Sequence, residues 1–233
     1  MTPSLRRHAI GVVAAVLVVA ALFILLVFAV RGQRGLGYEP AAVHATTGAR
    51  ITLGAYPDSM ACHGSGGGPH PDWVTYCPST TIKVPAYSTV TVTIDQYDSA
   101  TTLHNAFFAR VRGTVGGRMT VNGRSMTQVT PDAAGHTFTI QTPPNTNESQ
   151  LFVSVPLLGV PDNAPNVVTI NGNKYPRPNV IVFQFRTGSP GTYVWHCYIP
   201  CGIGLAGDGI GGQNNFGGPM ATTGYMSGTI TVV

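Results

Sequence analysis

Sulfur-bearing side chains gather in the C-terminal third of the chain, in positions suited to binding a metal ion. Cys197 and Cys201 follow an apolar run that ends in a loop, and Met220 and Met226 precede the last β-type segment. Thiolate and thioether sulfurs are soft ligands, which select copper over hard cations such as magnesium or calcium. A thiol after one strand and a methionine before the next therefore predict a copper site.

Histidines are the other candidate ligands. His136 begins an alternating segment at 136–140, and His104 precedes an asparagine further upstream. His196 is adjacent to Cys197, but neighbouring side chains in a strand point to opposite faces, so His196 is not expected to share a site with the thiol. No histidine follows His196, which leaves the region just before Met226 without an imidazole.

The elements that must position these ligands are predicted to be strands. Beyond residue 36 the sequence alternates apolar with polar or β-branched residues, and clusters of proline and glycine separate the runs. The predicted strand segments are 51–53, 81–84, 89–94, 136–140, 151–155, 180–185, 192–195 and 229–233. No sustained helical periodicity occurs in this region. We predict one all-β sandwich over residues 50–233, with long loop insertions that include a glycine-rich stretch at 202–219.

The N-terminal part of the chain is predicted to anchor the protein in a membrane. Residues 10–30 are all apolar or glycine, which is long enough for a helix to cross a bilayer. A cleavable signal peptide is the alternative, but the run is longer than a typical signal core and ends without a good cleavage site. We predict a short tail at 1–9, a single transmembrane helix at 10–30 and a linker at 31–49, with the C-terminal domain outside the cytoplasm.

The charge balance argues against a nucleic-acid partner. Four of the 13 basic residues flank the apolar run, and the nine that remain balance the nine acidic residues. The high pI therefore reflects the membrane flanks rather than a basic surface for nucleic acid. Four arginines do cluster in one glycine-containing segment, either on a solvated hairpin or on a surface that docks an anionic partner. They are Arg110, Arg112, Arg118 and Arg124.

Cys62 and Cys77 form a second cysteine pair, which brackets a loop containing His63 and His70. In an oxidising compartment two such cysteines are expected to form a disulfide. The alternative is a metal clip made of both cysteines and both histidines.

Three motifs resemble the cupredoxin family. Residues 135–140 resemble the strand that supplies its first histidine ligand, residues 191–200 the strand leading to its cysteine, and residues 225–232 its methionine and final strand. The resemblance implies a cupredoxin-like Greek-key β-sandwich that binds copper and transfers one electron. It assigns the imidazole to His136, the thiolate to Cys197 and the thioether to Met226.

The chain departs from that pattern at the second histidine. Cupredoxins carry one shortly before the methionine, where this chain has residues 221–224, Ala-Thr-Thr-Gly. Met220, His104 or Cys201 could fill the position. The spacing of Cys197 and Cys201 also resembles the dinuclear copper centre of cytochrome c oxidase subunit II, a membrane-anchored cupredoxin, in which the carbonyl of Ile199 would be a further ligand.

The leading hypothesis is a membrane-tethered, extracytoplasmic copper protein. It would exchange electrons with a redox partner protein in the membrane, in a respiratory chain, or store and deliver copper. The alternative is a metal-free structural or interaction module with Cys62–Cys77 and Cys197–Cys201 disulfides. An enzyme is a weaker hypothesis, because the sequence has no nucleophile-triad motif, no HExxH motif and no phosphate-cradling glycine loop.

Overall fold

The computed structural model describes residues 46–67, 70–200, 218–220 and 222–233. The chain divides into two compact units, Met1–Gly37 and Tyr38–Val233, and every described residue belongs to the second. Within the described residues no helix has the length and apolarity needed to cross a bilayer. The predicted anchor at 10–30 lies outside the described residues, so it stays a prediction.

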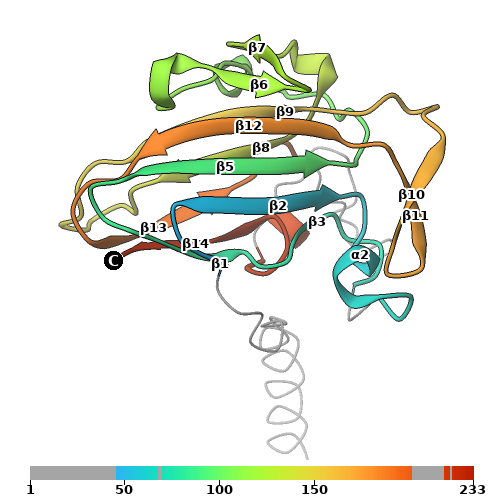
Figure 1. The fold of residues 1–233 in the computed structure, drawn as a ribbon, viewed down its shortest axis with the longest axis horizontal. Coiled ribbons are helices and arrows are strands. Elements are labelled where there is room, and N and C mark those ends of the chain that lie inside the picture. The colour runs from blue at the N-terminus through green and yellow to red at the C-terminus, as the bar shows by residue number, and fades with distance from the viewer. Residues whose placement is uncertain (1–45, 68–69, 201–217, 221) are drawn as a thin grey trace, which may run out of the picture. The chain divides into compact units, whose positions relative to one another are not determined.

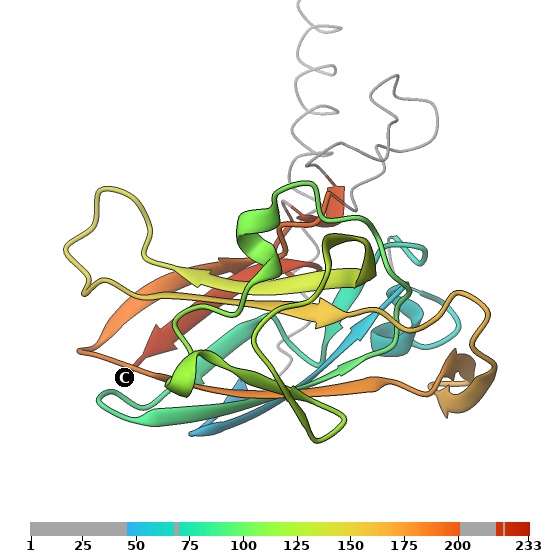
Figure 2. The same ribbon diagram turned by 90° about the horizontal axis from the view of Figure 1, so that it is seen from above.

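Two six-stranded sheets and one separate hairpin make up the domain (Figures 1 and 2). The first sheet has the spatial order β1 (Thr46–Thr47), β4 (Thr81–Val84), β14 (Ser227–Val232), β13 (Gly191–His196), β8 (Ala134–Gln141) and β9 (Phe152–Leu158). The second has the order β3 (Thr75–Cys77), β2 (Arg50–Tyr56), β5 (Thr89–Gln96), β12 (Asn179–Arg186), β6 (Met119–Val121) and β7 (Arg124–Met126). The hairpin consists of β10 (Asn166–Ile170) and β11 (Asn173–Pro176).

Parallel and antiparallel pairs are mixed in both sheets. β14 pairs in parallel with β4, and β2 in parallel with β5, whereas β13 is antiparallel to both of its neighbours, β14 and β8. Successive strands such as β4 and β5 lie in different sheets, so the chain repeatedly crosses between the two layers. The prediction of an all-β sandwich is confirmed.

Alternation along the strands places one set of side chains between the sheets. In β5 every second residue, from Val90 to Gln96, is buried, as expected for a strand with one face on a core. The core joins residues of both layers: Phe138 of β8 lies 4.7 Å, centroid to centroid, from Trp195 of β13 and 5.8 Å from Phe183 of β12. The indole nitrogen of Trp195 donates a hydrogen bond of 2.9 Å to the Thr80 carbonyl, so the largest core side chain has its polar atom satisfied.

All eight predicted strand segments overlap observed strands, and the structure adds six more. The additional strands are β1, β3, β6, β7, β10 and β11. β1 lies within 31–49, the predicted linker, and pairs in parallel with Ile82 and Lys83 of β4. Most of these strands have two to four residues, which is too short for a two-residue period to be recognised in sequence.

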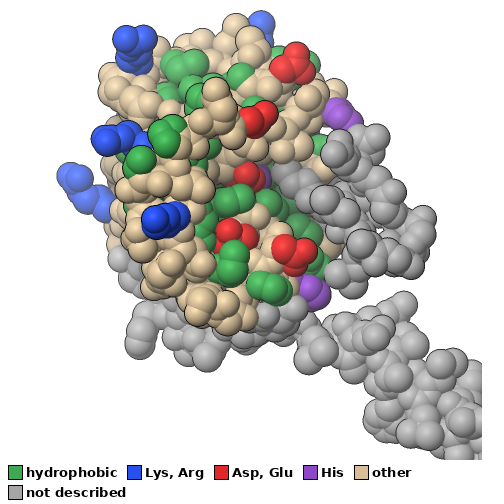
Figure 3. Space-filling view, turned by 90° about the vertical axis from the view of Figure 1, so that its right-hand side faces the viewer, with side chains coloured by type: hydrophobic (Ala, Val, Ile, Leu, Met, Phe, Trp, Pro, Cys, Tyr) green, Lys and Arg blue, Asp and Glu red, His purple; other side chains and the backbone are tan. Residues whose placement is uncertain are grey.

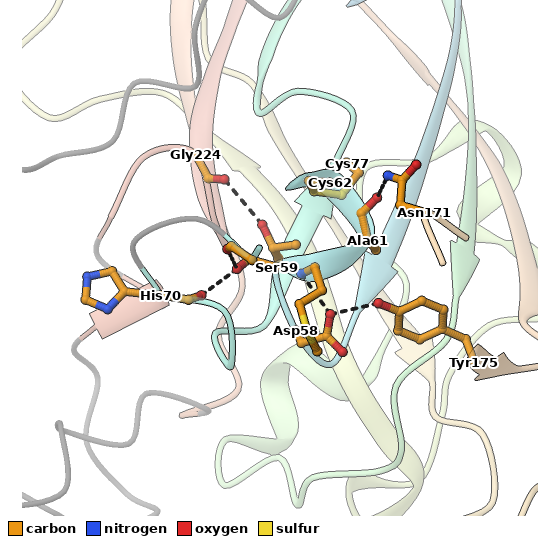
Figure 4. Close-up of a disulfide and its surroundings, with 12 residues drawn as sticks. Asp58, Ser59, Ala61, Cys62, His70, Cys77, Asn171, Tyr175 and Gly224 are labelled. Atoms are coloured by element: carbon orange, nitrogen blue, oxygen red, sulfur yellow. Dashed lines mark hydrogen bonds between the residues drawn. A yellow bond between two sulfur atoms is a disulfide. The ribbon is translucent and has the colours of Figure 1, made fainter. Parts of the chain in front are cut away.

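A disulfide ties the segment after β2 to the end of the next strand. Cys62, in the short helix α2 (Met60–His63), is bonded to Cys77 at the end of β3 (Figure 4). The predicted disulfide is therefore confirmed, and the alternative metal clip is wrong because both sulfurs are used in the bond. Closing a loop of this length stabilises a domain by about 3 kcal/mol.

Hydrogen bonds hold the surroundings of the disulfide (Figure 4). The Asp58 carboxylate accepts from the Met60 amide at 2.9 Å and from the Tyr175 hydroxyl at 2.8 Å. These bonds link the disulfide loop to the β10–β11 hairpin.

Candidate metal centre

Three predicted ligands lie at the ends of neighbouring strands. His136 is in β8, Cys197 directly follows β13, and Met226 directly precedes β14. β13 lies between β8 and β14 and is antiparallel to both, and its last residue, His196, pairs with Thr139 of β8 and with Ser227 of β14. The amide of Cys197 donates a hydrogen bond of 2.9 Å to the Met226 carbonyl, which holds the two segments together.

The imidazole of His136 faces the thiol of Cys197. The Nδ1 atom of His136 lies 3.8 Å from the Sγ atom of Cys197, and both side chains are fully buried. On the other side of the ring, Nε2 lies 3.0 Å from Oδ2 of Asp98. A ring nitrogen held by a carboxylate fixes the orientation of a histidine, and this is the usual arrangement behind metal-binding imidazoles.

Backbone geometry brings the three groups together. A Cβ atom on Gly135 would lie 2.3 Å from the side-chain nitrogen of Gln96 and 2.8 Å from the Ser99 carbonyl, so only glycine allows β8 to approach the end of β5 this closely. This approach places His136 beside Asp98. The Thr137 amide then donates a hydrogen bond of 3.3 Å to the Cys197 sulfur, which suits a sulfur that carries negative charge.

Asp98 and Cys197 change the acidity of His136. Burial on its own lowers the pKa of this imidazole, but the hydrogen bonds and charges of Asp98 and Cys197 outweigh burial and raise the pKa to about 9. In the metal-free protein the ring is therefore held protonated between two acidic groups.

This raised pKa predicts a pH-dependent stability of the metal-free chain. An unfolded histidine titrates near pH 6.5, whereas His136 in the folded protein titrates at about 9. The folded state binds this proton more tightly than the unfolded state does. The protonated His136 therefore contributes fully to the free energy of unfolding below the unfolded pKa, and this contribution is lost as the pH rises through the folded pKa. We expect Asp98→Asn to lower the pKa of His136 and to reduce the decrease in the free energy of unfolding as the pH rises. Urea unfolding of the metal-free full-length chain at several pH values measures this decrease.

The exposed Asp162 provides the control for that prediction. Asp162→Asn removes the same charge away from the imidazole and should leave the pH dependence as in the wild type. Identical pH profiles for Asp98→Asn and the wild type would show that Asp98 does not hold the proton on His136.

Both methionines are buried in the core that also contains Cys197. Met220, at the end of the short 3-10 helix η4 (Gly218–Met220), and Met226 are fully buried and belong to the same apolar cluster as Cys197. The Met226 amide donates a hydrogen bond of 3.1 Å to the Pro219 carbonyl, so the backbone of η4 lies against the segment that carries Met226. The backbone segments that carry Met220 and Met226 therefore adjoin the segment that carries Cys197.

The remaining predicted ligands behave differently. His104 is exposed, in the loop before the 3-10 helix η1 (Ala106–Ala109), which sets it apart from the three buried ligands. Cys201 lies outside the described residues, so its part in a metal site or in a disulfide with Cys197 stays a prediction. His196 is half-buried and its ring lies 6.2 Å from that of Tyr198. Its exclusion from the site stays a prediction.

The donor set fits copper better than a hard cation. A span of 3.8 Å between Nδ1 and Sγ can be bridged by one ion, since metal bonds to imidazole nitrogen and thiolate sulfur are about 2.0 and 2.3 Å long in zinc sites. Within the described residues, no group of three or more His, Cys, Asp and Glu side chains could hold a metal ion. A site at His136 and Cys197 therefore depends on the methionine thioethers, which are soft ligands.

Comparisons with known proteins add a weak structural similarity. No family model and no curated protein matches the chain. Among solved structures, the chain is similar to a dithionite-reduced auracyanin from the photosynthetic bacterium Roseiflexus castenholzii, with a TM-score of 0.31 and 14% identity over 79% of this chain and 97% of that one. It is also similar to auracyanin B, with a TM-score of 0.28 and 18% identity over 79% of this chain and 88% of that one. Scores this low carry no argument about fold or function.

Proposed function

We propose that this protein is a cupredoxin-like copper protein that carries one electron. The observation that supports the proposal most strongly is the facing pair of His136 Nδ1 and Cys197 Sγ, 3.8 Å apart and fully buried beside Met226. These residues come from the segments at which the sequence resembles cupredoxins. A bound copper ion would supply the electron by changing between its cuprous and cupric states.

The ligands that we propose are His136, Cys197, Met226 and Met220. Met220 takes the position where a second histidine would be expected. Two thioethers and a thiolate make the set softer than one with two imidazoles, and soft sets favour the cuprous ion. A dinuclear centre of the subunit II type would also need Cys201, and we do not include it in the proposal.

The protein side of this function is to fix the ligands before copper binds. The Thr137 amide orients the sulfur of Cys197, and Asp98 orients the ring of His136. All four proposed ligand side chains are fully buried, so bulk water is kept away from the sulfur atoms. A rigid, dry site changes little between two oxidation states, which favours electron transfer over bond-making chemistry.

The location that we propose is outside the cytoplasm, with residues 10–30 anchoring the chain in a membrane. The Cys62–Cys77 disulfide supports an oxidising compartment, since such bonds are rare where thiols are kept reduced. A redox protein in or at the same membrane would be the partner.

A metal-free module is the second candidate, and one observation favours it. Asp98 and Cys197 together provide partners for both ring nitrogens of His136 without any metal. In that case the imidazole would be a buried structural group, and the domain would act through its surface.

Copper titration separates the two candidates. The full-length chain, reduced and purified without metal, would be titrated with cuprous ion against a coloured cuprous chelator. Our proposal predicts one tightly bound copper per chain and, after oxidation, a visible sulfur-to-copper absorption band. A chain that leaves all the copper with the chelator is a metal-free module.

A further inference from the structure

One surface next to the candidate metal centre combines exposed aromatic rings with arginines. We call it the aromatic–arginine surface and define it by Phe107, Phe152, Arg112 and Arg118. Arg118 belongs to it through its loop: the Thr114 hydroxyl donates to the Arg118 carbonyl at 2.9 Å, and the preceding Gly113 lies against the Phe152 carbonyl. Phe107 and Phe152 keep 46% and 40% of their area exposed, although large apolar side chains are usually buried. Aromatic residues and arginine are the types enriched where proteins bind each other.

Contacts within this surface hold it in a fixed shape. The guanidinium of Arg112 lies 4.0 Å from the ring centre of Phe107, and its Nε donates a hydrogen bond of 3.3 Å to the Phe107 carbonyl. The rings of Phe107 and Phe152 have centroids 6.0 Å apart. The backbone of Arg112 pairs with Ser154 of β9 through two hydrogen bonds, so the loop is fixed to the sheet. A surface ordered in advance loses less entropy when a partner binds.

The segment that supplies Phe107, Arg112 and Arg118 carries charge of one sign. Between Asp98 and Asp132 the chain contains four arginines and no acidic residue. Carboxylates gather elsewhere: the end of the domain on the right of Figure 1, where β2 and β5 end, has acidic and hydrophobic side chains across its middle and basic ones at its margins (Figure 3). An acidic partner is therefore attracted to the arginines and repelled from that end face.

A stack of rings connects the aromatic–arginine surface to the thiol. Phe107 contacts Phe108 edge-on at 5.2 Å, and Phe108 stacks on Tyr198 at 4.3 Å with an interplanar angle of 4°. Tyr198 follows Cys197 in the chain, and its amide donates to the hydroxyl of Thr137, whose own amide donates to the Cys197 sulfur. Only two ring contacts and one peptide bond separate Phe107 from Cys197.

We propose that the aromatic–arginine surface docks an acidic electron-transfer protein, and that electrons pass between this partner and the Cys197 sulfur along Tyr198 and Phe108. This inference rests on the proposed copper function. In each encounter the reduced site loses one electron and the oxidised partner gains it, and no covalent bond forms or breaks. Arginine suits such a partner because its planar fork pairs with carboxylates through two hydrogen bonds.

Stopped-flow kinetics of the copper-loaded, reduced full-length chain test the electron path. The oxidant is hexacyanoferrate(III), an anion, with the cation tris(phenanthroline)cobalt(III) as comparison. The double variant Arg112→Gln/Arg118→Gln should lower the rate constant with the anion about fivefold at low ionic strength and leave the rate with the cation equal or higher. Phe107→Ala should slow both oxidants.

The control is Arg50→Gln/Arg186→Gln, which removes the same charge at the first residue of β2 and the last residue of β12. It should change the rate with the anion by less than about twofold. Equal losses in the two double variants would overturn the proposal, because net charge alone would then explain the effect.

A binding measurement tests the partner class without copper. Fluorescent poly-L-glutamate should bind the metal-free full-length chain, and the Arg112→Gln/Arg118→Gln variant should bind it at least about fivefold more weakly. The same variant would also be tested with phosphatidylserine vesicles. If the arginines are needed for binding to the vesicles but not for binding to poly-L-glutamate, the surface binds lipid and the proposal is overturned. If the chain binds no copper but binds poly-L-glutamate in this way, the copper function fails while the docking surface for an acidic partner stands.

Discussion

Serine in place of Cys197 is expected to remove nearly all tightly bound copper. The substitution exchanges a soft, negatively charged ligand for a hard neutral hydroxyl at the centre of the candidate site. His136 would then face an oxygen in place of the sulfur that lies 3.8 Å from its Nδ1 atom. We expect copper content after loading and desalting to fall to less than about a tenth of the wild-type value, because metal affinity depends steeply on a deprotonated ligand. Elemental analysis of the loaded full-length chains measures this directly.

A buried methionine away from the site provides the matched control. Met119 in β6 is 1% exposed, and Met119→Leu removes a core thioether without touching the candidate ligands. This variant should keep wild-type copper content, and Met226→Leu should lose part of it. Copper retained in full by Cys197→Ser would exclude the thiol as a ligand.

Alanine in place of Phe138 is expected to cause a large loss of stability. The ring is fully buried and contacts Tyr76, Trp195 and Phe183, which belong to both sheets. Truncating a buried phenylalanine removes its transfer free energy and leaves a cavity, which costs about 3–5 kcal/mol. Urea unfolding of the metal-free chain measures the change.

Phe138 also connects stability to the site, because it lies two residues after His136 on the same face of β8. A surface control is Val167→Ala on β10, where the side chain is 59% exposed. Such surface changes stay within about 0.5 kcal/mol. A loss below about 1 kcal/mol for Phe138→Ala would contradict a packed core between the sheets.

The sequence was sufficient to predict the sandwich, because burial on one face leaves a two-residue period that is visible in β5, β12 and β13. The short strands were missed for the opposite reason. β6 and β7 have three residues each, and their place at the edge of the second sheet depends on pairing with Val182 and Ile181 far along the chain. The residues of the short strands do not by themselves predict such a pairing.

The candidate site was only partly predictable. His136, Cys197 and Met226 stand in motifs that resemble a known family, so their order was informative. Asp98 lies 38 residues before His136 and has no motif around it, so its bond to the imidazole emerges only from the fold. The stack of Phe108 on Tyr198 joins segments that are even more remote in sequence.

X-ray absorption at the copper edge of the cuprous, full-length protein is the most direct test of the proposed ligand set. We predict one nitrogen neighbour and at least two sulfur neighbours around each copper, from His136, Cys197 and the methionines. A copper surrounded only by nitrogen and oxygen, or a chain that takes up no copper under these conditions, would contradict it.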